Sequence, residues 1–191
     1  MGVTAGILMH AFGRPRGLLG RLGGLIMART NEKCAVWVIE LLDIQPNDRV
    51  LEVGFGPGVA IELMTQLTPV EHVSGIDSSM EMVKQGTARN VKNIGSGRVE
   101  LQHRSVEHLP FPDNSFDKVL AINSMQVWPD TAAGLREMRR VLKVTGKIAL
   151  GFTPYSGQAK DGVSELLTSV GFMDTRIVES ERGFCVLAVK P

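Results

Sequence analysis

From residue 49 onward, short apolar runs alternate with stretches whose apolar positions follow a helical period. The apolar runs cover residues 49–54, 72–76, 98–103, 116–122 and 147–152. The first is apolar at nearly every position, as a strand buried on both faces of a parallel sheet is. Helices are expected over residues 57–67, 79–89 and 131–142, with Ser78 and Asp130 as N-caps. The alternation predicts an α/β fold with helices on both faces of a parallel sheet.

The pattern changes after residue 152. A helix is expected over residues 158–170, and two strand-like runs follow at residues 174–180 and 184–189. The link between these runs is Glu181-Arg182-Gly183, and a short link that contains glycine is typical of an antiparallel hairpin. The sequence therefore predicts five parallel strands followed by a C-terminal antiparallel hairpin.

The composition fits one globular domain. The 191 residues are 43% hydrophobic and 21% charged, enough to bury one sizeable core. The formal net charge of +1 gives no overall field that would attract nucleic acid. Cys34 and Cys185 lie far apart in the sequence and have no His or Cys at metal-ligand spacing. We therefore expect no metal site, no disulfide framework and a cytoplasmic location.

Residues 1–30 are basic and contain no acidic residue. Apolar residues, mostly leucines, stand between their arginines, which are Arg14, Arg16, Arg21 and Arg29. This pattern favours amphipathic helices that pack their apolar side on the domain, with contact to a membrane surface or to an anionic acceptor as the alternative. We divide the chain into an N-terminal helical lid segment, residues 1–45, and a main domain, residues 46–191.

The strongest local motif is VLEVGFGPG at residues 50–58. Glycines at alternate positions after a buried strand permit a sharp turn and bring the backbone close to a ligand. A dinucleotide site needs the spacing GxGxxG, but Val59 occupies the last position of that pattern. The carboxylate of Glu52 would also repel a pyrophosphate, whereas it would attract the ammonium group of a methionine. The motif favours S-adenosylmethionine over NAD.

A second motif ends the next apolar run. Gly75-Ile76-Asp77 follows the glycine motif by about twenty residues, the spacing at which nucleoside-binding sheets carry an acidic residue for the ribose hydroxyls. An aspartate at this place also serves as a helix cap in many proteins. Together with the glycine motif, Asp77 indicates a nucleoside site.

Two further motifs follow in order, LPFPDNSFD at residues 109–117 and RVLKVTG at residues 140–146. With these four motifs, residues 45–153 resemble the class I S-adenosylmethionine-dependent methyltransferases, in particular the small bacterial type that includes the ubiquinone and menaquinone methylases. The resemblance implies a three-layer, Rossmann-like fold with a seven-stranded, mostly parallel sheet. It also implies that residues 46–191 bind S-adenosylmethionine and release S-adenosylhomocysteine.

The resemblance assigns roles to individual residues. Three glycines would shape the loop under the methionine and the ribose: Gly54, Gly56 and Gly58. Glu52 would lie near the amino group of the methionine, and Asp77 would bind the ribose hydroxyls. Asn123, at the end of the fourth strand, would lie beside the methionine end.

The resemblance also places the adenine, with one departure from the family pattern. Ser78 and Met82 would flank the base. Family members often have an acidic residue at the position of Ser105, which contacts the adenine amino group, and here that carboxylate is missing. The Ser105 hydroxyl and the Val106 backbone N–H remain, so we expect weaker adenine recognition.

Methyl transfer from a sulfonium depends mainly on alignment of the acceptor, so no catalytic constellation is required. We assign no catalytic residue; the candidates for a general base are His10, His103 and His108. Residues expected to face the acceptor are Met125, Gln126, Val127, Trp128, Thr153 and Tyr155. Asn31 is expected at the start of a helix, where it either reaches the methionine carboxylate or caps the helix.

Two functional interpretations remain. The first is an enzyme that methylates a small-molecule or lipid-like acceptor, and the second is a non-catalytic S-adenosylmethionine-binding or adaptor protein. The intact Glu52, glycines and Asp77 favour the enzyme. A nucleic-acid acceptor is disfavoured by the low net charge and by Asn123-Ser124-Met125-Gln126 in place of an Asn-Pro-Pro-Tyr motif. The sequence indicates neither the acceptor atom nor the oligomeric state.

Overall fold

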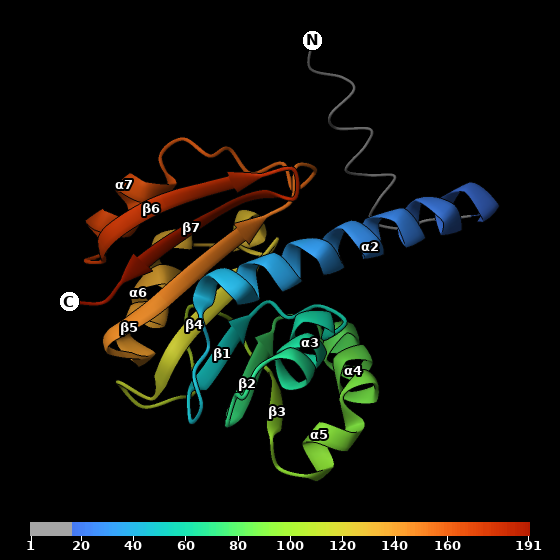
Figure 1. Cartoon of the computed structure of the whole chain (residues 1–191), viewed down its shortest axis with the longest axis horizontal. Helices are drawn as coiled ribbons and strands as arrows, with labels where there is room; N and C mark the ends of the chain where they lie inside the picture. The colour runs from blue at the N-terminus through green and yellow to red at the C-terminus, as the bar shows by residue number, and fades with distance from the viewer. Residues whose placement is uncertain (1–16) are drawn as a thin grey trace.

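The computed structural model describes the backbone of residues 17–191 and the side chains from residue 30 onward. In this part of the chain, one sheet has the strand order β3-β2-β1-β4-β5-β7-β6 (Figure 1). Its strands are β1 (Arg49–Val53), β2 (His72–Asp77), β3 (Val99–His103), β4 (Phe116–Ile122), β5 (Leu142–Phe152), β6 (Met173–Ser180) and β7 (Gly183–Val189). Strands β1 to β5 are parallel, and β7 runs antiparallel to both of its neighbours, β5 and β6. The predicted mostly parallel sheet with a C-terminal hairpin is confirmed.

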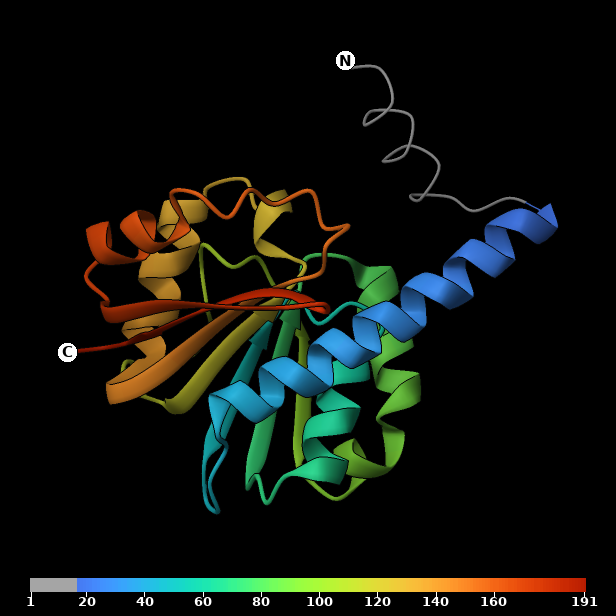
Figure 2. The same cartoon turned by 45° about the horizontal axis from the view of Figure 1, so that its top comes forward.

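Helices cover both faces of the sheet. The helices are α2 (Gly17–Leu42), α3 (Val59–Leu67), α4 (Met80–Arg89), α5 (Val91–Gly95), α6 (Thr131–Val141) and α7 (Val163–Ser169), and a 3-10 turn, η1, spans Met125–Val127. Figures 1 and 2 show α2, α3 and α4 on one face and α6 and α7 on the other. The three layers confirm the expected architecture. None of the helices in the described residues is both long and apolar enough to cross a membrane.

The core consists of two apolar layers, one on each face of the sheet. Successive residues of a strand point to opposite faces. Leu51 accordingly belongs to the layer under α6 and α7, whereas Val50 belongs to the layer under α2 and α3. By the same alternation, Glu52 lies on the face that α2 and α3 cover. The buried strands thus bring a carboxyl group into an apolar layer.

Helix α2 packs on the sheet through its C-terminal half. Cys34, Val38 and Leu42 are fully buried and recur at the spacing of one helix face. A Cβ atom at Gly151 of β5 would stand 2.5 Å from Val38, so the missing side chain lets α2 approach the sheet. The N-terminal half of α2 extends past the sheet (Figures 1 and 2).

The expectation that a helix begins at Asn31 is wrong, because Asn31 lies inside α2. The capping role considered for Asn31 is therefore excluded. Residues 1–16 and the side chains of residues 17–29 lie outside the described part of the chain, and with them His10 and the arginines of the expected lid segment.

Other differences from the expected elements have local causes. Helix α4 begins at Met80 with Ser79 as its N-cap, whose side chain accepts from Met82 N, so the cap assigned to Ser78 is wrong. Helix α7 begins at Val163, after Gly162 with φ 83°, and is shorter than predicted. Strand β5 begins five residues early, at Leu142, because Leu142 pairs with Phe116 ahead of an irregularity in the ladder.

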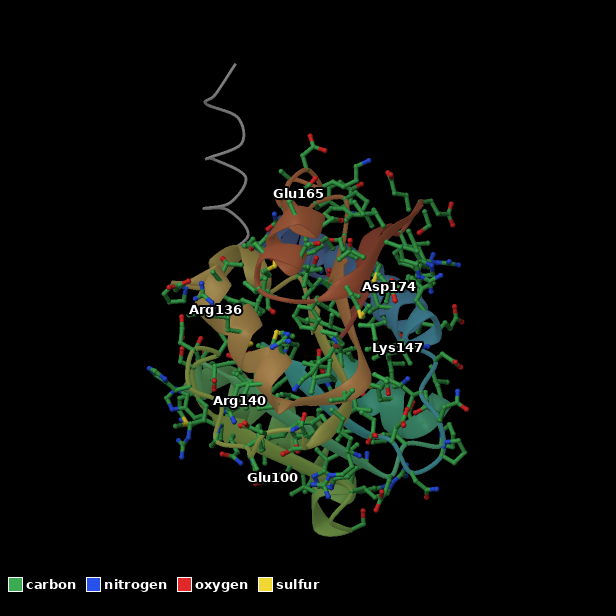
Figure 3. All side chains as sticks on the ribbon, turned by 90° about the vertical axis from the view of Figure 1, so that its left-hand side faces the viewer. Glu100, Arg136, Arg140, Lys147, Glu165 and Asp174 are labelled. Atoms are coloured by element: carbon green, nitrogen blue, oxygen red, sulfur yellow. The ribbon has the colours of Figure 1, made fainter. Side chains whose placement is uncertain are left out.

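Charged side chains of both signs lie on the outside of the molecule (Figure 3). The exposed residues Glu100, Arg136 and Glu165 come from β3, α6 and α7, which lie in different parts of the fold. The surface charges are therefore mixed, in line with the formal net charge of +1.

Candidate functional site

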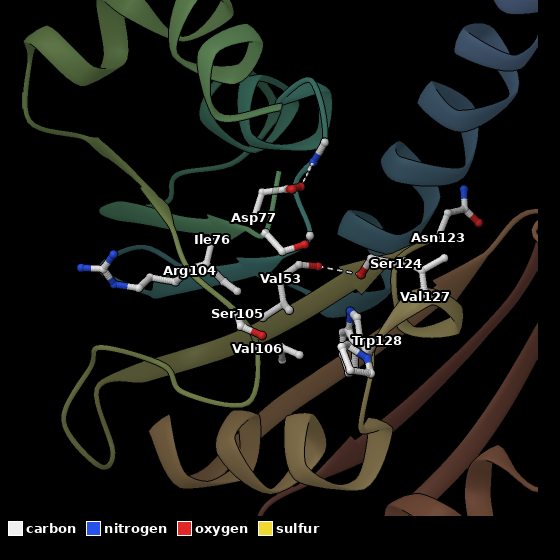
Figure 4. A pocket seen from close by; sticks show the side chains of 14 residues that line it. Val53, Ile76, Asp77, Arg104, Ser105, Val106, Asn123, Ser124, Val127 and Trp128 are labelled. Carbon is white, nitrogen blue, oxygen red and sulfur yellow. Dashed lines mark hydrogen bonds between the residues drawn. The ribbon is translucent and has the colours of Figure 1, made fainter. Parts of the chain in front are cut away.

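A pocket of about 300 Å³ opens at the carboxyl ends of β1, β2 and β4 (Figure 4). Between β1 and β4 the strand order of the sheet reverses, and ligands of open α/β sheets bind at such a point. Many residues expected in the site line this pocket: Gly54, Gly56, Asp77, Ser78, Ser105, Val106, Asn123 and Trp128. The topology thus brings together segments that are far apart in the sequence.

The turn after β1 depends on its glycines. Gly54 has φ 74°, and a Cβ atom there would overlap the side chain of Ser124. Gly56 has φ 55° and lines the pocket, and no atom lies within 4 Å of where its Cβ would stand. A side chain at Gly56 would therefore occupy the space of a ligand.

Asp77 fixes this turn from the end of β2. Its carboxylate is 8% exposed; Oδ2 accepts from the backbone N–H of Gly56 at 2.9 Å and Oδ1 from that of Ser79 at 2.8 Å. One carboxylate therefore joins β2, the glycine turn and the start of α4. It also lines the pocket, where its remaining lone pairs can accept from ligand hydroxyls.

Glu52 lies near the pocket-lining Asp77 but does not itself line the pocket. The side chain is 2% exposed, and its Oε2 has no hydrogen-bond partner. Burial, and then the nearby charge of Asp77, raise the pKa of Glu52 to about 8. A cationic group in the pocket would stabilise the ionised form of this carboxyl. The arrangement fits a ligand that carries both a positive charge and ribose hydroxyls.

The β3–β4 loop forms the wall at the β3 side of the pocket. Ser105 Oγ donates to the carboxylate of Glu107, and Val106 is buried against Gly134 of α6. Glu107 Oε1 also accepts from the backbone N–H of Asp130 at 3.4 Å. The loop is therefore tied to the start of α6.

At the β4 side, Asn123 is the centre of a hydrogen-bond network. Asn123 has φ 50°, and its Oδ1 accepts from Thr153 N at 2.8 Å and from Thr153 Oγ1 at 3.2 Å. Its Nδ2 donates to Asn31 Oδ1 at 3.2 Å, and its backbone oxygen accepts from Gln126 Nε2 at 2.9 Å. Asn123 lines the pocket and is hydrogen-bonded to three residues that do not line it: Asn31, Gln126 and Thr153.

Four other expected site residues also lie outside the pocket lining. Gly58 is the N-cap of α3, where its backbone oxygen accepts from Asn90 Nδ2 at 3.0 Å. Met82 is half-buried on α4, and Met125 is buried in the core layer under α6. Tyr155 is 78% exposed in the connection after β5. Met125 therefore faces the core, contrary to the expectation that it faces the acceptor.

The sequence reasoning missed several lining residues, of which Ser124 is the most informative. Ser124 is 7% exposed, and its Oγ donates to the backbone oxygen of Val53 at 2.8 Å (Figure 4). It joins the carboxyl ends of β4 and β1 next to Gly54. In the sequence Ser124 directly follows Asn123, and this position could have identified it as a site residue. The other missed residues are Val53, Ile76, Arg104 and Pro129, whereas Val127 lines the pocket as expected.

The described residues that line the pocket offer groups that bind and align a ligand, and none of them is a histidine. The lining contains the carboxylate of Asp77, the guanidinium of Arg104, the amide of Asn123, three serine hydroxyls and the apolar wall of Val106 and Trp128. The ring of His103 points instead to the backbone oxygen of Ser78, with Nε2 at 2.9 Å. Such a site holds a nucleoside and orients a reacting group.

Comparison with known proteins agrees with this geometry. Residues 51–150 match the family model described as a methyltransferase domain. The chain is 34% identical over 182 residues to the uncharacterized methyltransferase YdaC of Bacillus subtilis, with 89% of this chain and 98% of the relative covered. It is 36% identical over 130 residues to the demethylmenaquinone methyltransferase of Listeria welshimeri, with 68% and 55% covered.

A solved structure shows the same fold. The S-adenosylmethionine-dependent methyltransferase from Aquifex aeolicus superposes with a TM-score of 0.72 at 23% identity, and the match covers 82% of this chain and 89% of that one. The family match and the identity to YdaC identify the family. The chain belongs to the class I S-adenosylmethionine-dependent methyltransferases, and S-adenosylmethionine is its cofactor.

Proposed function

We propose that the pocket at β1, β2 and β4 holds S-adenosylmethionine and that the acceptor is a small, partly apolar molecule, quinol-like or lipid-like. The observation that carries the proposal is the buried carboxyl of Glu52, with an unpartnered oxygen, beside the pocket-lining Asp77. S-adenosylmethionine supplies a methyl group already activated on a sulfonium, so the protein has to bind and align.

The strand order supports an assignment of the two ends of the pocket. Asp77 accepts from the ribose hydroxyls, while Gly56 leaves room for the ribose and the methionine chain. Glu52 stabilises the ammonium group from below. The base lies toward β3, against Ser78, Ser105 and Val106, and the reacting end lies toward β4 and Asn123.

The acceptor assignment rests on the apolar rim at the β4 side. Val127 is 73% exposed and lines the pocket beside the half-buried Trp128. Exposed apolar side chains at a pocket mouth favour a planar or aliphatic acceptor. Asn123, held by Thr153 and Asn31, orients its neighbours so that the acceptor is in line with the methyl–sulfur bond. A relative that acts on demethylmenaquinone supports the quinol-like class.

Helix α2 supports a role for the N-terminal residues at the acceptor mouth. Asn31 links α2 to Asn123, and the helix continues past the sheet from there (Figure 2). We propose that residues 1–30 close over the pocket, supply part of the acceptor site and contact a membrane surface when the acceptor is a lipid. Deletion of residues 1–28 leaves the buried part of α2 intact, so it should retain the fold and abolish turnover. Unchanged turnover in the truncated protein would exclude the lid.

The cofactor site is tested by calorimetric titration with S-adenosylmethionine and with S-adenosylhomocysteine. Asp77→Ala should abolish binding, and Asp161→Ala, at an exposed aspartate outside the pocket, should leave it unchanged. Incubation with methyl-labelled S-adenosylmethionine and a set of quinols and lipid amines then tests the acceptor class. A folded protein that binds neither cofactor form would contradict the proposed site, whereas binding without label transfer to any of these acceptors would contradict only the acceptor class.

A further inference from the structure

The outer side of helix α2 carries exposed acidic groups. Glu32, Glu40 and Asp43 are exposed and recur, together with the half-buried Val36, at the spacing of one helix face. This face lies opposite to the one that packs on the sheet. Within the described residues, neither Glu32 nor Glu40 forms an ion pair. Two carboxylates of this face are therefore available to a partner.

Two hollows lie along this outer face. One has a volume of about 340 Å³ and lies between α2 and the turn from β6 to β7, and the other, of about 450 Å³, lies between α2 and the end of α3. Val36 and Glu40 line both hollows. The larger hollow is mostly apolar, Leu67 on its rim is 58% exposed, and its charged lining residues are the acidic Glu40 and Asp43. The outer face therefore suits a segment that brings apolar side chains and positive charges.

Residues 17–29 of the same helix have this chemistry. They carry α2 past the sheet (Figures 1 and 2) over about 20 Å, and a helix of this length is marginal in water without tertiary packing. Their sequence contains Arg21 and Arg29 and no acidic residue. Three leucines recur at a helical spacing that continues to the face of Val36: Leu18, Leu22 and Leu25. The N-terminal half of α2 is therefore an apolar and basic counterpart to the outer face of its C-terminal half.

Two copies of α2 that lie antiparallel bring these two halves together. A twofold axis between residues 30 and 31 pairs groups of complementary chemistry: Arg21 with Glu40, Arg29 with Glu32, and Leu25 with Val36. One register gives all three pairs, because the members of each pair lie equally far from the axis along the helix. An anionic membrane would meet the carboxylates of this face as well as its arginines. The charge pattern therefore favours a second copy of the chain as the partner.

We propose that the chain forms a twofold-symmetric dimer through helix α2, in which residues 17–29 of each copy pack on the outer face of residues 32–43 of the other. An interface of this kind is isologous, so every pair of residues occurs twice. The leucines supply apolar contacts at the two hollows, and the opposite charges determine the register. The dimer does not depend on the proposed cofactor site, and it leaves residues 1–16 for the proposed lid.

Sedimentation equilibrium of the full-length protein tests the dimer, which should be present at micromolar concentration. Glu40→Arg places two arginines opposite each other at both ends of the interface and should raise the dissociation constant of the dimer at least about tenfold. Adding Arg21→Glu to this variant restores opposite charges and should return the constant to within about threefold of the wild-type value. The matched control is Glu165→Arg, at an exposed position of α7 on the other face of the sheet, and it should leave the constant unchanged.

Disulfide cross-linking tests the register. The double variant Leu25→Cys with Val36→Cys should form a covalent dimer under mild oxidation, because the two new thiols lie about 16 Å apart along one helix and can pair only between copies. The control is Leu25→Cys with Thr168→Cys, whose second thiol is exposed on α7, and it should run as a monomer on denaturing gels. The native Cys34 and Cys185 are buried and serve as the common background.

Circular dichroism establishes that each variant is folded. A wild-type protein that stays monomeric up to about 0.1 mM would overturn the proposal. A dimer that Glu40→Arg leaves unchanged, or one that the double cysteine variant does not cross-link, would overturn it as well. A monomer that binds vesicles of anionic lipid would overturn it and assign residues 17–29 to a membrane surface. Titration of the same samples with S-adenosylhomocysteine reports separately on the cofactor site, so the failure of one proposal is distinguishable from the failure of the other.

Discussion

The carboxylate of Asp77 accepts a hydrogen bond from the backbone N–H of Gly56 at 2.9 Å. This bond joins the end of β2 to the turn after β1, two segments that the sheet places side by side. The residue proposed to bind the ribose therefore also holds the turn on which we propose that the cofactor lies. Binding and local structure are coupled at this position.

Asp77→Asn tests that coupling. The amide keeps the size of the side chain but loses the charge, and its NH₂ group faces the backbone N–H of Gly56 in one orientation and that of Ser79 in the other. We expect S-adenosylhomocysteine affinity to fall by about 10- to 100-fold and the free energy of unfolding by about 1–3 kcal/mol. Calorimetry and urea unfolding measure the two effects. Asp161→Asn should change neither.

Gly56→Ala should abolish cofactor binding with a modest loss of stability. The left-handed backbone at φ 55° costs an alanine about 1–2 kcal/mol, and the new methyl group projects into the pocket. Gly97→Ala is the matched control, because Gly97 also has a left-handed backbone, φ 77°, and open space around its Cβ position but lies outside the pocket. Equal cofactor affinities of the two variants would contradict the proposed place of the ribose and methionine.

Glu52 should make the stability of the free protein depend on pH. Its pKa is raised from 4.5 to about 8 in the folded state, so between these values the folded protein holds a proton that the unfolded chain has lost. Stability therefore falls as pH rises through this window, by up to about 1.4 kcal/mol per pH unit. Urea unfolding from pH 5 to pH 8.5 should show this loss for the wild type and not for Glu52→Gln. Parallel pH profiles of the two proteins would show that Glu52 is ionised throughout.

The same carboxyl predicts proton release when the cofactor binds. The ammonium group of S-adenosylhomocysteine favours the ionised form of Glu52, so binding near pH 7 should release close to one proton. Titrations in two buffers with different ionisation enthalpies measure this number. Glu52→Gln should release none, and an unchanged release in this variant would point to another group.

Two substitutions at Asn123 should separate the contributions of its side-chain hydrogen bonds and of its backbone conformation to the free energy of unfolding. Asn123→Gly removes the hydrogen bonds to Thr153 and Asn31 and leaves the buried Thr153 N–H without its acceptor, a loss of about 1–3 kcal/mol. Asn123→Ala adds the strain of a left-handed backbone and should lose about 1 kcal/mol more. Chemical unfolding of both variants provides the comparison. An alanine variant as stable as the glycine variant would argue against strain at this position.

Much of the fold was predictable because its signals are local. The apolar run of β4 gave the bounds Phe116–Ile122 as observed, and Asp130 caps α6 as expected. The centre of the site was also predictable, because Gly54, Gly56 and Asp77 belong to two short motifs with a fixed spacing in the sequence. These motifs meet because parallel strands end at one edge of a sheet.

The remaining features depend on contacts between distant segments. Ser78 and Ser79 are equivalent as caps in the sequence, and only the path of the chain out of β2 selects Ser79. Met125 and Gln126 are neighbours, but the 3-10 turn η1 sends Met125 into the core and leaves Gln126 exposed. The hydrogen bond that the Ser105 hydroxyl donates to Glu107 depends on the conformation of the β3–β4 loop, which no local pattern specifies.

The position of β7 between β5 and β6 determines the order in which the strands of the sheet can pair during translation. During translation β6 leaves the ribosome before β7, yet within residues 17–191 its one strand partner is β7. The nascent chain therefore carries β6 and α7 without a docking strand until residues 183–189 have emerged. The parallel part of the sheet, which contains β1, β2 and β4 and hence the ends that form the pocket, has all its strands by residue 152. The strands that carry the proposed nucleoside site therefore leave the ribosome before the hairpin is complete, and in that interval unpaired strand edges are open to aggregation or to chaperones.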